Sequence, residues 1–249
     1  MANPKRLSIA LILGSGPSAP SARNWPKPAN VKIIAINNAW RARPDWDYLV
    51  HAGDFPASRR PERMAPWQSV RSHESYVPAQ NRFGGFVYGG GTMAFTAGYW
   101  ALDALKPDIL AYFACDMTYS GKMTHFYGEG TADPLRPDVT LQSLEAKSAR
   151  LMALAGRQGC ACVNLSAEPV SRLIFPRAAF ADLERPAATV PTDPDAIDTA
   201  LSEESRLGYM IEDGEYWHHT EHLDASALSR IDDMWLRACQ PGQREKRFA

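Results

Sequence analysis

The sequence predicts an α/β fold: a doubly wound, mostly parallel sheet, with a small α-rich appendage at the C-terminus. Two observations carry this prediction. Short continuous apolar runs, typical of strands buried on both faces, alternate with helical patterns over residues 1–180. Beyond them the composition changes and helical patterns predominate. Alternating elements of this length imply parallel strands with helices on both faces, which is a Rossmann-like arrangement.

Five apolar runs are the predicted strands of the sheet. A glycine-containing turn follows the first run, Asn37-Asn38 ends the second, and the third ends near Asp54. The fourth delivers Cys115-Asp116 at its carboxyl end. Ligands bind beyond the carboxyl ends of strands in such sheets, so we expect the site at these turns. The runs cover residues 7–13, 31–36, 48–51, 109–114 and 160–165.

Two helices are predicted between the strands. Thr92 is the predicted N-cap of a helix over 93–105, which Lys106-Pro107 ends because the residue before proline avoids the helical region. A second helix follows a loop over 117–139 and stops at Gly159. Its apolar face is formed by Leu141, Leu144, Leu151, Met152 and Leu154.

Three further segments complete the predicted organisation. Residues 56–82, rich in Arg, Pro and Ser, are expected to form a long irregular lid or binding loop. The chain is predicted to divide into residues 1–180 and 181–249. Residues 184–204 are rich in Pro, Asp, Thr and Ala, which indicates a linker or surface wrap. The α-rich appendage over 205–239 has a helical stripe of Leu228, Ile231, Met234 and Trp235.

Charge and hydropathy exclude two kinds of partner. Lys and Arg number 27 and Asp and Glu 28, a formal net charge of −1, so no overall field favours nucleic acid or anionic lipid. No apolar run reaches the ~18 residues of a membrane-spanning helix. Residues 5–22 loosely imitate a signal peptide, but the apolar run leads into a Gly-Ser-Gly-Pro-Ser turn and is interpreted as a strand. We therefore expect a cytoplasmic protein.

The turn Gly14-Ser15-Gly16-Pro17-Ser18 directly follows the first predicted strand. Its glycines permit close backbone approach, and amides that open a helix can hold a phosphate. No Gly-Lys-Ser/Thr follows, so the turn is not a Walker motif, and it fits the dinucleotide fingerprint only loosely. The alternative interpretation is a tight β–α turn.

Two further sets of polar groups are candidates for ligand binding. Gly90, Gly91 and Thr92 open the predicted helix over 93–105 and offer a second set of backbone amides; the alternative is a flexible hinge. Asn37 and Asn38 carry amides that can read a base or ribose hydroxyls. Their alternative interpretation is turn chemistry.

His125 is the candidate general acid or base. It is flanked by aromatic and small residues, and a histidine can exchange a proton near neutral pH. The strand-end Asp116 is expected to bind a hydroxyl or cap a turn, and Tyr119 or Tyr127 to steady a departing phosphate. The alternative for His125 is a buried structural role.

Other patterns are interpreted as structural, so no metal site is predicted. Asp45-Trp46-Asp47 has the form of a DxD motif but leads into the third strand from the wrong end. His218 and His222 have the spacing of two zinc ligands on one helix, but no other ligands lie nearby in the sequence. They are therefore interpreted as a surface cluster. The four cysteines fit neither a zinc nor a redox pattern and are expected to be buried. Four arginines could contact phosphate but are interpreted as a solvated face: Arg59, Arg60, Arg63 and Arg71.

The order of these motifs resembles the superfamily of bacterial lipooligosaccharide sialyltransferases and archaeal 6-hydroxymethylpterin diphosphokinase-like proteins. The chain most resembles its phage and bacterial members, from which no activity can be carried over. The resemblance covers roughly residues 7–177 and implies a GT-A-like variant of the fold, with residues 1–180 as a nucleotide-sugar-binding domain. The matching segments are Asn37–Asp54, Asp116–Gly128, Asn164–Ser166 and Phe175–Arg177.

In the sialyltransferases the corresponding motifs hold a cytidine nucleotide sugar, and no metal is required. The resemblance thus implies Gly14–Ser18, Asn37 or Asn38, Gly91 and Thr92 as nucleotide contacts, with no required cofactor. The sialyltransferase base is a histidine in a different motif, so the role of His125 is not part of what the resemblance implies.

Three functions follow as alternatives. The leading one is a metal-independent glycosyltransferase with a CMP-type nucleotide-sugar donor and a saccharide or other hydroxyl acceptor. The second is a Mg-ATP-dependent diphosphokinase-like transferase, in which Asp54 and Asp116 would converge on the metal. The third is a non-enzymatic nucleotide-binding, phage-related protein. A homo-oligomer is compatible with each.

Overall fold

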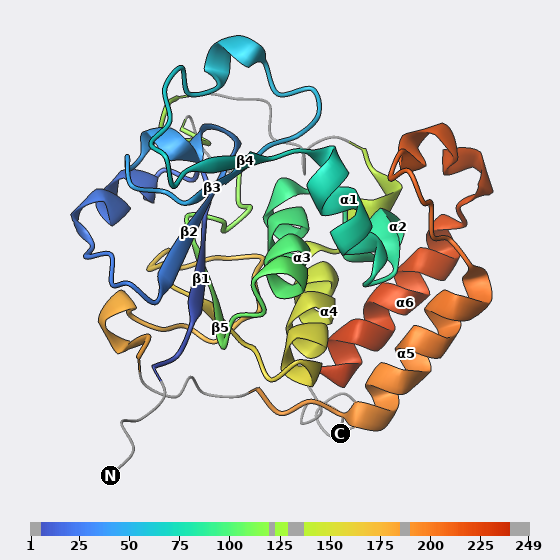
Figure 1. Ribbon diagram of the computed structural model, residues 1–249. Coiled ribbons are helices and arrows are strands. Elements are labelled where there is room, and N and C mark those ends of the chain that lie inside the picture. Colours follow the sequence, from blue (N-terminus) through green and yellow to red (C-terminus); the bar gives the residue numbers. More distant parts are fainter. Residues whose placement is uncertain (1–5, 120–122, 129–136, 185–189, 240–249) are drawn as a thin grey trace.

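The computed structural model describes residues 6–119, 123–128, 137–184 and 190–239 of the chain. Its six strands form one parallel sheet in the order β4-β3-β2-β1-β5-β6, which confirms the predicted Rossmann-like α/β fold (Figure 1). The chain runs outward from β1 to β4 and then crosses back to β5, so the strand order reverses between β1 and β5. The strands are β1 (Ile9–Leu13), β2 (Val31–Ile36), β3 (Tyr48–Val50), β4 (Ser69–Arg71), β5 (Ile109–Phe113) and β6 (Ala161–Asn164).

Three α-helices cover one face of the sheet. Helix α3 (Met93–Ala104) crosses the central strands, α4 (Leu144–Arg157) lies against β6, and α1 (His73–Asn81) lies against β4 (Figure 1). The short α2 (Gly85–Gly89) precedes α3, whose N-cap is Thr92 as predicted. Ala10 and Ile12 of β1 belong to the core under these helices.

Short 3₁₀ helices and loops cover the opposite face. These are η1 (Ala19–Asn24), η2 (Asn37–Arg41) and η6 (Phe180–Asp182). The other residues of β1, Ile9, Leu11 and Leu13, belong to the core on this side. Both faces of the central strand are therefore buried, which is why its sequence is continuously apolar.

Residues 56–82 are not irregular throughout, so the prediction of one long irregular segment was wrong. They contain η3 (Ala57–Arg59), the edge strand β4 and helix α1. Arg71, in β4, lies with its guanidinium 5.1 Å from the ring centre of Tyr48 and 5.5 Å from that of Trp100. This arginine therefore packs on aromatic rings instead of forming part of a solvated face.

Residues 184–204 are not a simple linker, because α5 (Pro194–Leu207) begins within them. Two short turns, η7 (Tyr216–His218) and η8 (Thr220–His222), lead to α6 (Ala225–Ala238). Helices α5 and α6 pack on each other, and α6 also packs on α4 (Figure 1). The predicted stripe is largely buried, and its residues lie in the core shared with α3 and α4: Leu228, Ile231 and Trp235, with Met234 partly buried.

Two buried ion pairs join α4 to these C-terminal helices. Lys147 Nζ lies 2.8 Å from Asp232 Oδ1, and Arg150 Nη2 lies 2.7 Å from Glu204 Oε2. Arg150 also donates to the hydroxyl of Tyr99 at 2.9 Å. Burial raises the pKa of Asp232, although the Lys147 ammonium opposes this shift. The packing of α4 on the C-terminal helices thus depends on matched charges as well as apolar contacts.

All four cysteines are buried and free, as predicted. Among the helices in the described ranges, none is long and apolar enough to cross a membrane.

Candidate functional site

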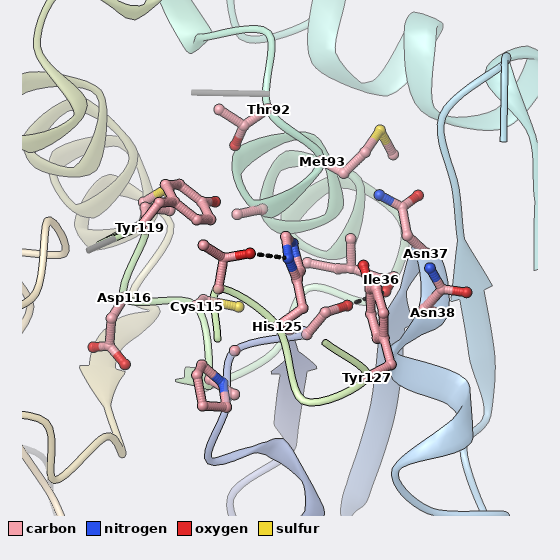
Figure 2. Close-up of a pocket in the computed structure, with 18 of the residues that line it drawn as sticks. Ile36, Asn37, Asn38, Thr92, Met93, Cys115, Asp116, Tyr119, His125 and Tyr127 are labelled. Carbon is pink, nitrogen blue, oxygen red and sulfur yellow. Dashed lines mark hydrogen bonds between the residues drawn. The ribbon is translucent and has the colours of Figure 1, made fainter. Parts of the chain in front are cut away.

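A cavity of about 670 Å³ opens at the carboxyl edge of the sheet, where the strand order reverses (Figure 2). The turns after β1, β2, β3 and β5 surround it, together with the N-terminus of α3 and residues 123–127. Of the predicted site residues, Ser18, Gly90 and Gly91 are not among those that line it. The structure brings together the remaining ones: Gly14, Ser15, Gly16, Pro17, Asn37, Asn38, Asp54, Thr92, Asp116, Tyr119, His125 and Tyr127.

The glycines of the first turn allow β1 and β5 to lie close together. The Gly14 amide donates to the carbonyl of Phe113 at 2.9 Å, and the Gly16 amide donates to that of Ala114 at 2.9 Å. A Cβ at position 14 would lie 2.5 Å from Cys115 Sγ and would also collide with the Ala114 carbonyl. These two amides are therefore engaged within the protein, and the glycines are required by backbone packing.

Replacing Gly14 with alanine is expected to destabilise the protein by about 1–3 kcal/mol, because the added methyl group has no room. The substitution should also weaken the binding of any ligand in the cavity, because the turn after β1 must move. Urea unfolding followed by circular dichroism measures the first effect. Gly53→Ala is the matched control, because a Cβ at position 53 would meet nothing within 4 Å; equal midpoints for the two variants would contradict this account.

The N-terminus of α3 forms part of the cavity wall. Met93 and Ala94, its first residues, line the cavity, and the first amides of an α-helix have no partner within the helix. Thr92 does not cap them with its side chain. In the described part of the structure, the buried Oγ1 of Thr92 has no hydrogen-bond partner, and neither has the buried Oδ1 of Asn38. Helix N-termini favour anions, so this end of the cavity is suited to a phosphate.

The strand-end backbone is strained around the cavity. Among the described non-glycine residues, Asn37, Ala114, Met117 and Lys106 have a positive φ, and the first three line the cavity. Asn37, at φ 49°, accepts the amide of Ala52 on its Oδ1 at 3.1 Å. This bond links the ends of β2 and β3, so part of Asn37 has the turn role that was its alternative interpretation. Backbone strain of this kind is frequent at functional sites.

His125 lies on a tight turn that closes over the first glycine turn. Backbone hydrogen bonds join His125 and Gly128 in both directions, at 3.0 and 3.1 Å, and Phe126 donates to the carbonyl of Ser15 at 3.0 Å. His125 Nδ1 lies 3.0 Å from Thr124 Oγ1, and its ring stacks on Tyr127 at 5.0 Å between centroids (Figure 2). Burial lowers the pKa of His125, so its neutral form, which can accept a proton, predominates at neutral pH. Gly121 and Lys122 of the same predicted motif lie outside the described residues.

Asp116 is held by its neighbours on the β6 side. Its Oδ2 accepts the hydroxyl of Ser166 at 2.6 Å, and Arg177 lies 3.9 Å from its Oδ1. In Figure 2 the carboxylate turns away from His125. The geometry therefore favours a bracing role for Asp116 at the rim of the cavity over contact with a group held by His125.

Cys115 also lines the cavity, and its thiol is protonated at neutral pH. Burial and the nearby Asp116 raise its pKa far above the ordinary value. A thiol in this state is a poor nucleophile, so Cys115 is better explained as packing against Gly14.

Sequence reasoning passed over several residues of the cavity. Arg59 lines it from η3, although its position predicted a solvated face. Glu168 lies four residues beyond β6, and the rule that ligands bind at carboxyl ends could have identified it. Thr118 and Thr124 carry no sequence signal, because their place depends on how the loop after β5 folds.

The position of Gly91 is set by the C-terminal part of the chain. The Gly91 amide donates to Thr140 Oγ1 at 3.1 Å, and Asp138 accepts the hydroxyls of both Thr140 and Tyr216 at 2.7 Å. A side chain at position 91 would collide with the Tyr216 hydroxyl. Tyr216 thus holds the turn that leads into α3, although it lies far from that turn in the sequence.

The patterns interpreted as structural have structural roles. Asp47 pairs with Lys27 and Lys32, at 2.8 and 3.2 Å, on the side of the sheet where β3 begins. His218 and His222 are exposed and lie in separate 3₁₀ turns instead of on one helix. Over the described ranges, no group of three or more His, Cys, Asp or Glu side chains could hold a metal ion.

No family model, no curated protein and no solved structure matches the chain. The residues of the cavity are therefore the basis for a functional assignment. They combine a helix N-terminus suited to an anion with a neutral histidine.

Proposed function

We propose that the protein is a transferase of the glycosyltransferase type that requires no metal. It would take a glycosyl group from a nucleotide sugar, most simply one of CMP type, and pass it to a saccharide or other hydroxyl acceptor. The observation that carries this proposal is the N-terminus of α3, which lines the cavity at the reversal of strand order and where, in the described structure, the hydroxyl of Thr92 has no hydrogen-bond partner.

The residues around this point have matching roles in the proposal. The donor phosphate lies against the amides of Met93 and Ala94, and Thr92 Oγ1 donates to it. The base or ribose extends toward Asn38, whose buried Oδ1 has no hydrogen-bond partner in the described structure. Arg59, which also lines the cavity, adds a positive charge that compensates the phosphate.

The chemical step needs one base. His125 accepts the proton of the acceptor hydroxyl while the hydroxyl oxygen bonds to the anomeric carbon of the donor. The bond between that carbon and the phosphate oxygen breaks, and its electron pair leaves with the nucleotide phosphate. Tyr127 and Tyr119, whose rings lie 5.0 and 6.0 Å from that of His125, line the space in which the leaving phosphate departs.

A thermal-shift panel tests the proposal with CMP, CMP-sialic acid, UDP- and GDP-sugars and ATP, each with and without Mg²⁺. A ligand at 100 times its Kd adds about 2.7 kcal/mol, on the order of 5–10 °C for a chain of this size. We expect one nucleotide-sugar class to raise the Tm without Mg²⁺. A shift with ATP only in the presence of Mg²⁺ would favour diphosphokinase-like transfer, and no shift with any nucleotide would favour a non-enzymatic protein.

Thr92→Val separates ligand binding from folding. Because the hydroxyl of Thr92 has no partner in the described structure, its removal should leave the Tm of the free protein unchanged. A hydrogen bond to a charged phosphate is worth about 1.5–3 kcal/mol, so nucleotide affinity should fall on the order of 10- to 100-fold. Isothermal titration calorimetry measures the loss, and an unchanged Kd would place the phosphate elsewhere in the cavity.

A further inference from the structure

A second hollow, of about 550 Å³, adjoins the first. It lies beyond the carboxyl ends of β5 and β6, against the start of α4. Met117, Thr118, Tyr119 and Glu168 line both hollows. The two therefore share a wall, and molecules bound in each would meet beside Tyr119.

The second hollow lacks the uncapped helix N-terminus that the first one has. The N-cap of α4, Ser143, accepts the amide of Ala146 on its side chain at 3.1 Å, so this helix end is already capped. Glu145 follows in its first turn and pairs with Arg172 at 2.8 Å. Glu168 adds a further carboxylate. With its arginine paired and its carboxylates in excess, the hollow disfavours an anion.

Apolar surface accompanies these acceptors. Val170 is 61% exposed and lines the second hollow next to Pro169. The ring of Tyr119 forms part of the wall. Carboxylate oxygens accept hydrogen bonds from hydroxyl groups, and aliphatic and aromatic surfaces pack on C–H faces. This combination suits a neutral, hydroxyl-rich molecule such as a saccharide.

Hydrogen bonds between the loops after β5 and β6 hold the wall that the two hollows share. The amide of Arg172 donates to the carbonyl of Asp116 at 2.9 Å, and the Asp116 carboxylate accepts from Ser166. The loop after β6 is thereby tied to the end of β5. This bracing keeps the two hollows in a defined relation and accounts for the carboxylate of Asp116 turning away from His125.

We propose that the second hollow binds the acceptor, and that the acceptor is a neutral saccharide or polyol instead of a phosphorylated or otherwise anionic one. This inference rests on the proposed function for the identity of the first substrate. One acceptor hydroxyl passes Tyr119 to reach His125, whose ring centre lies 6.0 Å from that of Tyr119. Its oxygen bonds to the anomeric carbon, its proton moves to His125, and the nucleotide phosphate leaves into the first cavity.

Ligand-observed NMR on the full chain tests the inference with methyl β-D-galactoside and galactose 6-phosphate, each with and without CMP. Two variants probe the second hollow: Val170→Trp fills that hollow alone, and Glu168→Lys reverses a charge on the wall that both hollows share. Both side chains are exposed, so folding should be unaffected. Glu221→Lys, an equally exposed change outside both hollows, is the matched control.

In the wild type we expect saturable binding of the neutral galactoside and weaker binding of the phosphate ester. Val170→Trp should weaken binding of the galactoside at least tenfold. Glu168→Lys should shift the binding preference toward the phosphate ester. Tighter binding of the ester to the wild type, absence of galactoside binding, or galactoside binding unchanged in both variants would overturn the inference. If CMP binds and the galactoside does not, only the acceptor site is ruled out. If the galactoside binds and CMP does not, only the proposed donor site is ruled out.

Discussion

Replacing His125 with alanine is expected to lower the rate of transfer by about 10²- to 10⁴-fold while nucleotide affinity is retained. This is the usual contribution of a positioned general base, and the His125 side chain contacts Thr124, Tyr119 and Tyr127, whereas in our proposal the donor phosphate lies at the N-terminus of α3. Single-turnover transfer and calorimetric titration of CMP measure the two quantities. His222→Ala, at an exposed histidine in η8, is the control. Unchanged turnover in His125→Ala would remove His125 from the mechanism.

The pH dependence follows from the same residue. Burial lowers the pKa of His125 below its ordinary value of 6.5. A base must be neutral to accept a proton, so kcat/KM should be constant at neutral pH and fall as the pH drops through this lowered pKa. The midpoint of the acidic limb is therefore expected below pH 6.5. The limb should be absent from the residual activity of His125→Ala.

Replacing Glu204 with alanine is expected to lower the free energy of unfolding by about 3–5 kcal/mol. The change leaves the buried guanidinium of Arg150 without its counter-charge, and an unpaired buried charge is strongly destabilising. Burial alone would lower the pKa of Arg150, but the charges and hydrogen bonds of Glu204 and Tyr99 together outweigh this effect and raise that pKa. The Trp235 indole also loses its acceptor, since it donates to Glu204 Oε1 at 2.8 Å. Chemical denaturation measures the loss.

The control for this prediction lies on the same helix. Asp198 of α5 pairs with Arg157, but its side chain is 67% exposed. Asp198→Ala should change stability by less than about 1 kcal/mol, because solvent screens an exposed pair. Similar losses for Glu204→Ala and Asp198→Ala would show that the C-terminal helices contribute little to the cooperative unit.

Much of the sheet could be predicted because a central parallel strand must be apolar on both faces. The runs that became β1 and β5 satisfy this condition, and the run that became β2 satisfies it except at Lys32. The edge strand β4 does not, since its three residues are only half-buried. Helix α1 contains Pro78, which usually argues against a helix. By contrast, α5 had a sequence signal that composition obscured, namely Asp193 as N-cap followed by a proline at the first helical position.

The location of the candidate site could be predicted from the sequence, but the role of each side chain could not. Parallel strands end at one edge, so the residues after β1, β2, β3 and β5 had to gather there. Whether Asn37 faces a ligand or the Ala52 amide depends on the left-handed backbone at its own position. The partners of Asp116 and Gly91 come from distant segments, Ser166 and Tyr216. Local spacing carries no information about contacts of this kind.

The link from Tyr216 through Asp138 and Thr140 to Gly91 makes two events interdependent. A ligand that holds the Gly91–Thr92 turn in its bound form also favours the docked position of η7. Coupling between two sites is reciprocal. If the bound ligand suppresses partial opening of the C-terminal helices by some factor, that opening must lower the affinity for the ligand at α3 by the same factor. Amide exchange near Tyr216 should therefore slow when the cavity is filled. Slower exchange would thus report occupancy of the cavity at a residue, Tyr216, that is not among those that line it.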